Sequence, residues 1–146
     1  GWYSENYTGS IAPALGLGAF YGSAGEGKIS SAPREDYAEA AVVALTGQGH
    51  EGKTYELAGD EFYTLTDLAA EITAQSGKDI PYRNIPEADY AAALKNAGLP
   101  DGFAEAIASW DTGASQNALF DDSHVLSKLI GRKTTPIAVS VQKALA

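Results

Sequence analysis

The feature of this sequence that most constrains its fold is an alternation of short extended segments with amphipathic helical ones. Residues 53–59 (KTYELAG) are predicted to form a strand, and residues 64–77 (TLTDLAAEITAQSG) carry apolar side chains at helical spacing. Residues 80–86 (IPYRNIP) are predicted to form a second short strand. A strand, a helix and another strand in succession are typical of an α/β protein.

The helix over 64–77 has clear signals at both ends. Thr64 can cap its N-terminus together with Asp67, and Gly77 lies where a left-handed residue ends a helix. Four apolar residues are predicted to form its buried stripe: Leu65, Leu68, Ala69 and Ile72. These signals are local, so the prediction does not depend on the rest of the fold.

Similar start and stop signals predict further helices elsewhere in the chain. Because several of these helices lie toward the C-terminus, the last third of the chain is predicted to be mostly helical. These helices are expected at 34–47, at 87–98 after Pro86, from Asp101 onward, at 121–131 and from Pro136 to the C-terminus. In the helix over 34–47 (REDYAEAAVVALTG) the side chains predicted to face inward are Tyr37, Ala41, Val42 and Leu45.

Length and composition predict one globular domain and exclude several function classes. The chain has 146 residues, 45% of them apolar, and a formal net charge of −9. This charge repels phosphate backbones, so nucleic acid is not an expected partner. The longest mostly apolar stretch, residues 11–22, is broken by glycines and Pro13, so no membrane span is predicted. No signal peptide is visible, and the cytoplasm is the expected compartment.

No metal site or familiar catalytic motif is predicted. The chain lacks cysteine, and neither of its two histidines has a second ligand at metal-binding spacing. Residues 22–28 (GSAGEGK) match part of a phosphate-binding loop, but Ile29 stands where a Ser or Thr would hold magnesium. A turn between two short strands is the better interpretation of this segment.

The opening residues GWYSENYTGS combine flat aromatic rings with hydrogen-bonding side chains. One interpretation is that Trp2, Tyr3 and Tyr7 are core residues beside a helix start. The other is that they form the wall of a ligand site in which Asn6 donates a hydrogen bond to a carbonyl oxygen. Arg34 either adds positive charge to such a site or pairs with a neighbouring acid.

Several long segments together resemble the bacterial NAD(P)H:quinone oxidoreductases of the NmrA-like group, which are atypical short-chain dehydrogenases. The segments are GWYSENY (1–7), GKISSAPREDYAEAA (27–41), GHEGKTYELAGD (49–60), SGK (76–78), EADYAAALKNAGLPDG (87–102), DTGAS (111–115) and LFDDSHVLSKLIGRKTTP (119–136). The resemblance runs along the whole chain. It covers only the C-terminal half of the proteins in that group.

The resemblance implies an enzyme and a site. The implied reaction is direct hydride transfer from NADPH or NADH to a quinone, with Asn6 as the catalytic residue that stabilises charge on the quinone oxygen. The implied cofactor-binding residues are Gly1, Trp2, Tyr3, Ser4, Glu5 and Arg34. A non-enzymatic NmrA-type regulator that senses dinucleotide and binds a protein partner is the alternative.

The resemblance also implies that residues 1–146 are the substrate-binding portion of an NAD(P)-binding Rossmann-type fold. The N-terminal, dinucleotide-binding half would then be the partner of this chain, and the isolated chain is expected to be inactive with apolar faces exposed. Association with a second copy of the chain is left open.

Overall fold

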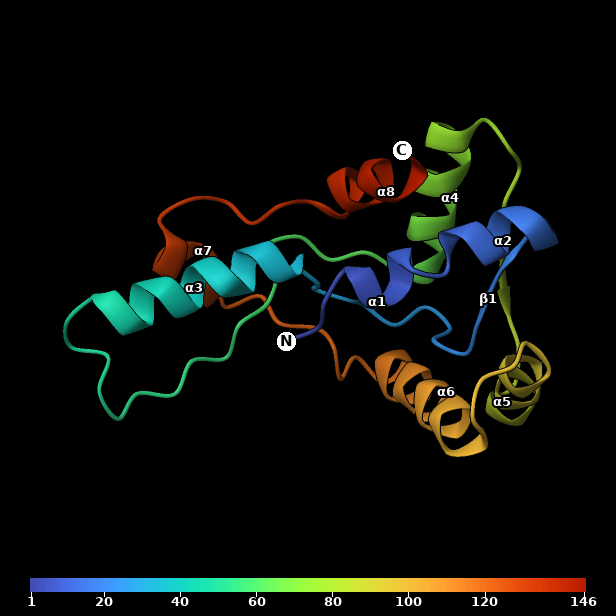
Figure 1. Ribbon diagram of the computed structural model, residues 1–146, viewed down its shortest axis with the longest axis horizontal. Helices are drawn as coiled ribbons and strands as arrows, with labels where there is room; N and C mark the ends of the chain where they lie inside the picture. The colour runs from blue at the N-terminus through green and yellow to red at the C-terminus, as the bar shows by residue number, and fades with distance from the viewer.

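The computed structural model describes residues 1–146 and confirms an α/β fold with short parallel strands (Figure 1). The elements in chain order are α1 (Glu5–Thr8), α2 (Ile11–Leu17), β1 (Phe20–Gly22), α3 (Arg34–Thr46), α4 (Leu65–Ser76), β2 (Tyr82–Asn84), α5 (Glu87–Asn96), α6 (Asp101–Ser115), α7 (Val125–Ile130) and α8 (Ile137–Leu145). The last third is mostly helical, as predicted. No helix is long and apolar enough to cross a lipid bilayer.

Helix α4 forms as its sequence predicts. The Thr64 hydroxyl accepts a hydrogen bond from the Asp67 backbone N–H, the Asp67 carboxylate accepts one from the Thr64 N–H, and Gly77 ends the helix with a φ of 68°. The predicted stripe of Leu65, Leu68, Ala69 and Ile72 is buried. This stripe lies in the main core, where it meets residues of α1, α2, β1 and α8.

The only sheet is a parallel pair formed by β1 and β2. Phe20 pairs with Tyr82 and Gly22 with Asn84, so α3 and α4 both lie in the connection between the two strands. The prediction of a strand within 80–86 is confirmed for Tyr82–Asn84. A short strand was expected before the turn at 22–28, and β1 lies there, but its pairing with β2 was not predicted.

Two predictions were wrong, and both fail on the same side of the molecule. Residues 53–59 form no strand: the backbone N–H groups of residues 54–58 donate no hydrogen bond within the chain, and only at the end of the segment does the Gly59 N–H donate to the Ser30 carbonyl, at 3.0 Å. On α3 the buried residues are Asp36 and Ala40, whereas Val42 and Leu45 are 58% and 85% exposed. No element of this chain covers that face of α3.

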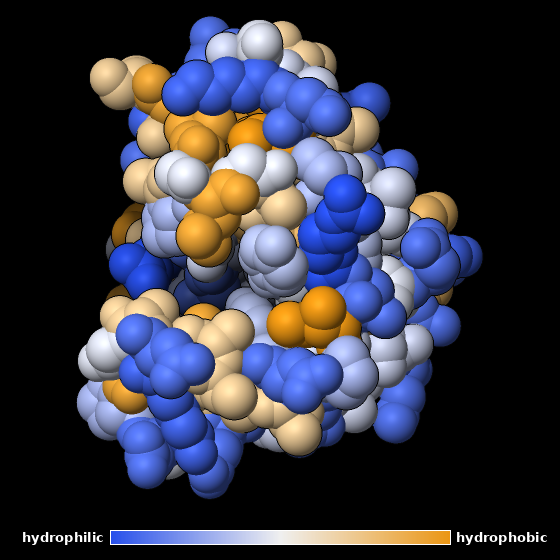
Figure 2. Space-filling model, turned by 90° about the vertical axis from the view of Figure 1, so that its right-hand side faces the viewer, coloured by the Kyte–Doolittle hydropathy of each residue, from blue (hydrophilic) through white to orange (hydrophobic).

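A second, smaller core lies between α3 and α7, which run side by side at the left of Figure 1. Its buried members are Ala32, Ala40 and Leu126. The opposite end of the molecule carries α2, β1 and α5. Figure 2 shows this end with apolar residues interspersed among charged ones, and with a hollow between the part that carries α5 and the part above it.

Candidate functional site

The opening segment lies between α3 and α6 and is fixed by backbone pairing before α1 begins. Tyr3 forms an isolated parallel bridge with Ala32. The Ser4 N–H donates to the Ala32 carbonyl at 2.9 Å, and the Ala32 N–H donates to the Trp2 carbonyl at 3.2 Å. The first residues therefore follow one fixed path across the surface, which determines where each side chain points.

Tyr37, on α3, clamps the start of this segment. Its hydroxyl accepts from the Trp2 N–H at 3.1 Å and lies 3.3 Å from the carbonyl oxygens of Trp2 and Leu57. Burial raises the pKa of the Tyr37 phenol to about 12, although the backbone hydrogen bond to Trp2 lowers it. Gly1 is exposed, but a Cβ there would lie 2.5 Å from the Tyr37 Oη and closer still to the Leu57 carbonyl. Glycine is thus required at position 1 by packing within the chain.

Ser4 faces the interior. Its Oγ lies 2.9 Å from the Ser31 Oγ, which in turn lies 2.7 Å from the Tyr63 hydroxyl, and all three residues are buried. Burial raises the pKa of the Tyr63 phenol, so the hydroxyl stays protonated and can donate along this chain. The Ser4 side chain therefore supports the loop from below and presents no atom to the surface.

Three side chains of this region are exposed: Tyr3, Asn6 on α1, and Arg34 at the start of α3. The Arg34 guanidinium carbon lies 5.3 Å from the centre of the Tyr3 ring, and Arg34 makes no ion pair. Glu5 accepts the Arg34 backbone N–H at 3.0 and 3.2 Å, which ties α1 to the start of α3. The amide of Asn6 has no hydrogen-bond partner within the chain and is free to bind a ligand.

A buried carboxylate joins α1 to α6. Asp111 accepts a hydrogen bond from the Tyr7 hydroxyl at 3.0 Å and another from the Ser23 N–H at 2.9 Å. Burial raises the pKa of Asp111, and the two hydrogen bonds lower it in part. This bond fixes α1 against α6, and Asn6 and Trp110 directly precede the two bonded residues in the sequence.

The structure thus brings the residues proposed from the resemblance into one region, where Gly1 to Asn6 adjoin Arg34, but Ser4 is buried and does not reach the surface. Residues that fix this region were missed by the sequence analysis: Ser31, Tyr63, Asp111 and the hydroxyl of Tyr37. No local sequence signal could have found Asp111, because its partner Tyr7 is 104 residues away.

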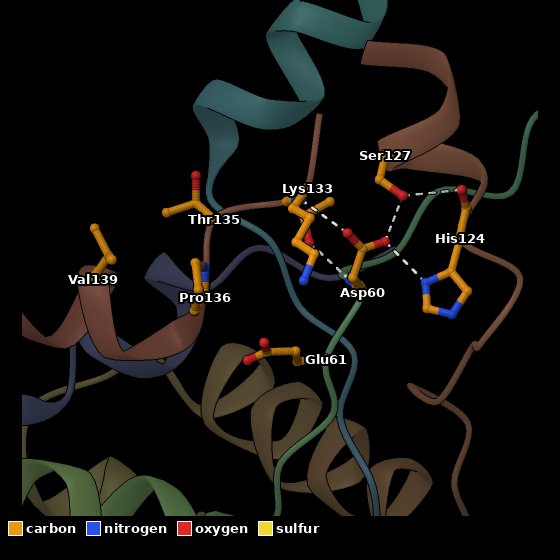
Figure 3. Close-up of a pocket in the computed structure, with 9 residues that line it drawn as sticks. Asp60, Glu61, His124, Ser127, Lys133, Thr135, Pro136 and Val139 are labelled. Atoms are coloured by element: carbon orange, nitrogen blue, oxygen red, sulfur yellow. Dashed lines mark hydrogen bonds and ion pairs between the residues drawn. The ribbon is translucent and has the colours of Figure 1, made fainter. Parts of the chain in front are cut away.

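A separate depression, with a volume of about 730 Å³, lies elsewhere on the molecule (Figure 3). At its wall Asp60 accepts from Ser127 Oγ at 2.6 Å and from the Thr134 N–H at 3.0 Å, and it lies 3.0 Å from His124 Nδ1. Burial opposes ionisation of Asp60, but these hydrogen bonds together keep its pKa below the usual value. Ser127 Oγ and His124 Nδ1 contact the same carboxylate oxygen, and Ser127 Oγ also donates to the His124 backbone carbonyl at 3.2 Å. The hydroxyl makes no hydrogen bond to the imidazole ring, so this is not the arrangement of a serine nucleophile and its base. The cluster holds the segment between α7 and α8 in place.

No group of three or more His, Cys, Asp or Glu side chains is arranged to hold a metal ion. The site residues available for chemistry are therefore an amide, a guanidinium and aromatic rings. This set suits recognition of an organic ligand by hydrogen bonding, charge and stacking.

Comparison with known proteins gives three informative relatives, although no family model matches the sequence. Quinone oxidoreductase 2 of Escherichia coli is 61% identical over 97% of this chain and 49% of its own length. Its crystal structure as an NADPH-dependent enzyme complexed with NADPH superposes on all of this chain and 52% of its own, with a TM-score of 0.97 and 59% identity.

The other two relatives are more distant. An uncharacterized protein of Haemophilus influenzae is 36% identical over 82% of this chain and 67% of its own. The triphenylmethane reductase of Citrobacter sp., in complex with NADP(H), is 31% identical over 97% of this chain and 50% of its own, with a TM-score of 0.92. The chain spans about half the length of the first of these curated relatives.

The fold and these neighbours define the class as NAD(P)-binding α/β reductases. Within that class, the chain belongs to the NmrA-like family of atypical short-chain dehydrogenases and corresponds to the C-terminal half of its quinone oxidoreductases. Two expectations drawn from the resemblance are therefore confirmed: the family to which the chain belongs, and its correspondence to the C-terminal half of the proteins in that family.

Proposed function

We propose that this chain supplies the substrate-side half of an NADPH-dependent quinone reductase. The observation that carries the proposal is the free amide of Asn6, exposed on α1, whose preceding residues are fixed by the contacts of Tyr37 with Trp2 and of Ser31 with Ser4. A fixed helix start that presents one unpaired hydrogen-bond donor has the preorganisation that charge stabilisation requires. The similarity to the E. coli quinone oxidoreductase supports this function over the regulator.

The residues present fit a nicotinamide cofactor, as judged by their chemistry and exposure. Tyr3 and Arg34 together offer an exposed aromatic face and a cation that no carboxylate neutralises. Gly1 and Trp2 contribute backbone at the edge of the same loop, and Glu5 fixes its orientation toward α3. We propose that these residues contact the nicotinamide side, with Ser4 acting only as the buried support. When bound, the cofactor supplies a hydride.

The net reaction converts a quinone, NADPH and one proton into a hydroquinone and NADP⁺. As the quinone carbonyl is reduced, negative charge develops on its oxygen, and a hydrogen bond donated by the Asn6 amide stabilises that charge. The guanidinium of Arg34 adds positive potential to the same surface. Positioning of the two reactants in contact provides the rest of the rate acceleration.

The proposal extends to the whole protein in three respects. The 1–146 portion binds substrate, an N-terminal Rossmann half binds the dinucleotide phosphates, and the complete enzyme acts in the cytoplasm. NADPH is proposed over NADH because the solved relatives are NADPH and NADP(H) complexes. The isolated chain is expected to be inactive, since it carries no glycine-rich phosphate loop between a strand and a helix.

The test is replacement of Asn6 by Ala in the full-length protein. Loss of one donor to a developing oxyanion lowers kcat by about a hundredfold in other enzymes, and we expect a loss of that order with an unchanged Kd for NADPH. The matched control is Asn96→Ala, an exposed asparagine at the end of α5, which should behave as the wild type. An equal loss of kcat and of NADPH affinity, or no loss at all, would contradict the role of Asn6.

A further inference from the structure

A row of four aromatic rings extends from α1 onto α6. The Trp2 ring centre lies 6.2 Å from that of Tyr7 and 5.8 Å from that of Trp110, and the Trp110 centre lies 6.2 Å from that of Phe103. The two contacts made by Trp110 are edge-to-face, with interplanar angles of 74° and 77°. These distances and angles are typical of favourable aromatic pairs, so each ring holds the next in place.

Exposure increases along this row. Tyr7 is 7% exposed, whereas Trp110 and Phe103 are 44% and 51% exposed. Phe103 and Trp110 are seven residues apart, about two helical turns, and therefore lie on the same face of α6. The buried residues of α6 are smaller: Ala104, Ala108, Asp111 and Ala114. The two large rings remain partly exposed on this helix.

The row starts at the proposed site. The hydrogen bond between the Tyr7 hydroxyl and Asp111 fixes α1 against α6, and the residues immediately before these two are Asn6 and Trp110. Trp2 belongs to the loop proposed to contact the cofactor, and its indole packs against that of Trp110. The exposed rings therefore begin at the segment that is proposed to contact the cofactor, through the contact between Trp2 and Trp110.

We propose that Trp110 and Phe103 form an aromatic platform for the quinone, in which one ring stacks on its flat face and the other, nearly perpendicular, contacts its edge. This platform favours fused two-ring quinones over single-ring ones. The inference rests on the proposed function and adds the determinant of substrate class. Stacking and burial both increase with the area of the bound ring system, so a larger ring gains more from the platform. A quinone carries no net charge, which suits a platform built from uncharged rings.

The experiment compares 1,4-naphthoquinone with 1,4-benzoquinone in the full-length protein at saturating NADPH. Trp110→Leu keeps an apolar side chain but removes the ring. We expect the ratio of kcat/KM for naphthoquinone to that for benzoquinone to fall by about three- to tenfold, chiefly through a higher KM for naphthoquinone. Trp110→Phe should retain most of the ratio because it retains a ring.

Two further variants keep the test decisive. Phe103→Leu lies at the exposed end of the row, so it should fold normally and lower the ratio by a smaller amount. Leu17→Ala changes an apolar residue of α2 that is 70% exposed and lies outside the row, and it should leave the ratio unchanged.

An unchanged ratio in Trp110→Leu and Phe103→Leu would overturn the platform, whether the individual rates stay constant or fall together. Rates that fall together, with lower thermal stability, would show that the rings are covered by the other half of the protein. If the wild-type protein reduces neither quinone, the proposed function itself fails, which separates that result from failure of the platform.

Discussion

Asp111 is the residue whose ionisation is most closely linked to the candidate site. It is buried without a cationic partner, and its two hydrogen-bond donors are the Tyr7 hydroxyl and the Ser23 N–H. Because burial raises the pKa of Asp111, the folded state holds a proton more tightly than the unfolded chain does. The free energy of unfolding that Asp111 contributes is therefore highest in acid and decreases as the pH rises through the folded pKa.

Replacement of Tyr7 by Phe tests this link in the full-length protein. The change removes the donor to Asp111 but keeps the ring, and an unsatisfied buried acceptor should lower the free energy of unfolding by about 1–3 kcal/mol at pH 7. The loss should be smaller at pH 5, because a protonated carboxyl is less costly to bury than a carboxylate. Urea unfolding at both pH values measures it, with Tyr21→Phe on the exposed strand residue as the control. An identical loss at the two pH values would contradict the link to Asp111.

Individual site residues could be predicted from the sequence only where a family motif contained them. The motif at residues 1–7 led to Asn6 and Tyr3, both of which lie exposed, but it could not show that Ser4 points inward. That orientation depends on Ser31, which is 27 residues further along the chain. Trp110 has an apolar side chain at helical spacing, which alone would indicate a buried residue. Its actual exposure depends on the segments that lie beside α6, and these cannot be predicted from the local sequence.

At the scale of single elements, helices were more predictable than strands. Helix α4 carries its own cap, stripe and stop within 64–77, so its prediction needs no information from elsewhere. Strand β2 was predicted within 80–86, but β1 is only three residues long, and β2, its partner, begins 62 positions after it. A strand is stabilised by such distant partners, which explains why the pairing of β1 with β2 was not predicted and why the unpaired segment 53–59 was wrongly predicted as a strand.

The capping box of α4 gives a prediction at this scale. Thr64→Ala removes the acceptor for the Asp67 N–H and should lower the free energy of unfolding by about 1 kcal/mol. Thr66→Ala, within the first turn of the same helix, is the control and should change it by less than about 0.5 kcal/mol. Chemical denaturation of the two variants of the full-length protein compares them directly. A cost for Thr66→Ala as large as that for Thr64→Ala would mean that helix propensity, and not the cap, determines the effect.

At the scale of the whole molecule, one side carries groups that no part of this chain satisfies. The backbone N–H groups from Thr54 to Ala58 donate no hydrogen bond within the chain. Tyr55 and Leu57 are half-buried while Glu56 between them is exposed, which is the alternation of a strand on the edge of a sheet. The exposed Val42 and Leu45 of α3 add apolar side chains that no part of this chain covers.

We expect residues 54–57 to pair with a strand of the N-terminal half in the full-length protein. Buried backbone N–H groups are almost always paired, so a free extended segment beside half-buried side chains is a site for strand addition. Hydrogen exchange measures this pairing, and the amides of 54–57 should exchange at least about a hundredfold more slowly than those of the turn at 48–52. The amides of Ala69 and Ile72 within α4 are the internal reference, since their helical hydrogen bonds form within this chain. Exchange at 54–57 as fast as in the turn, with α4 protected, would show that the segment stays unpaired and that the two halves meet elsewhere.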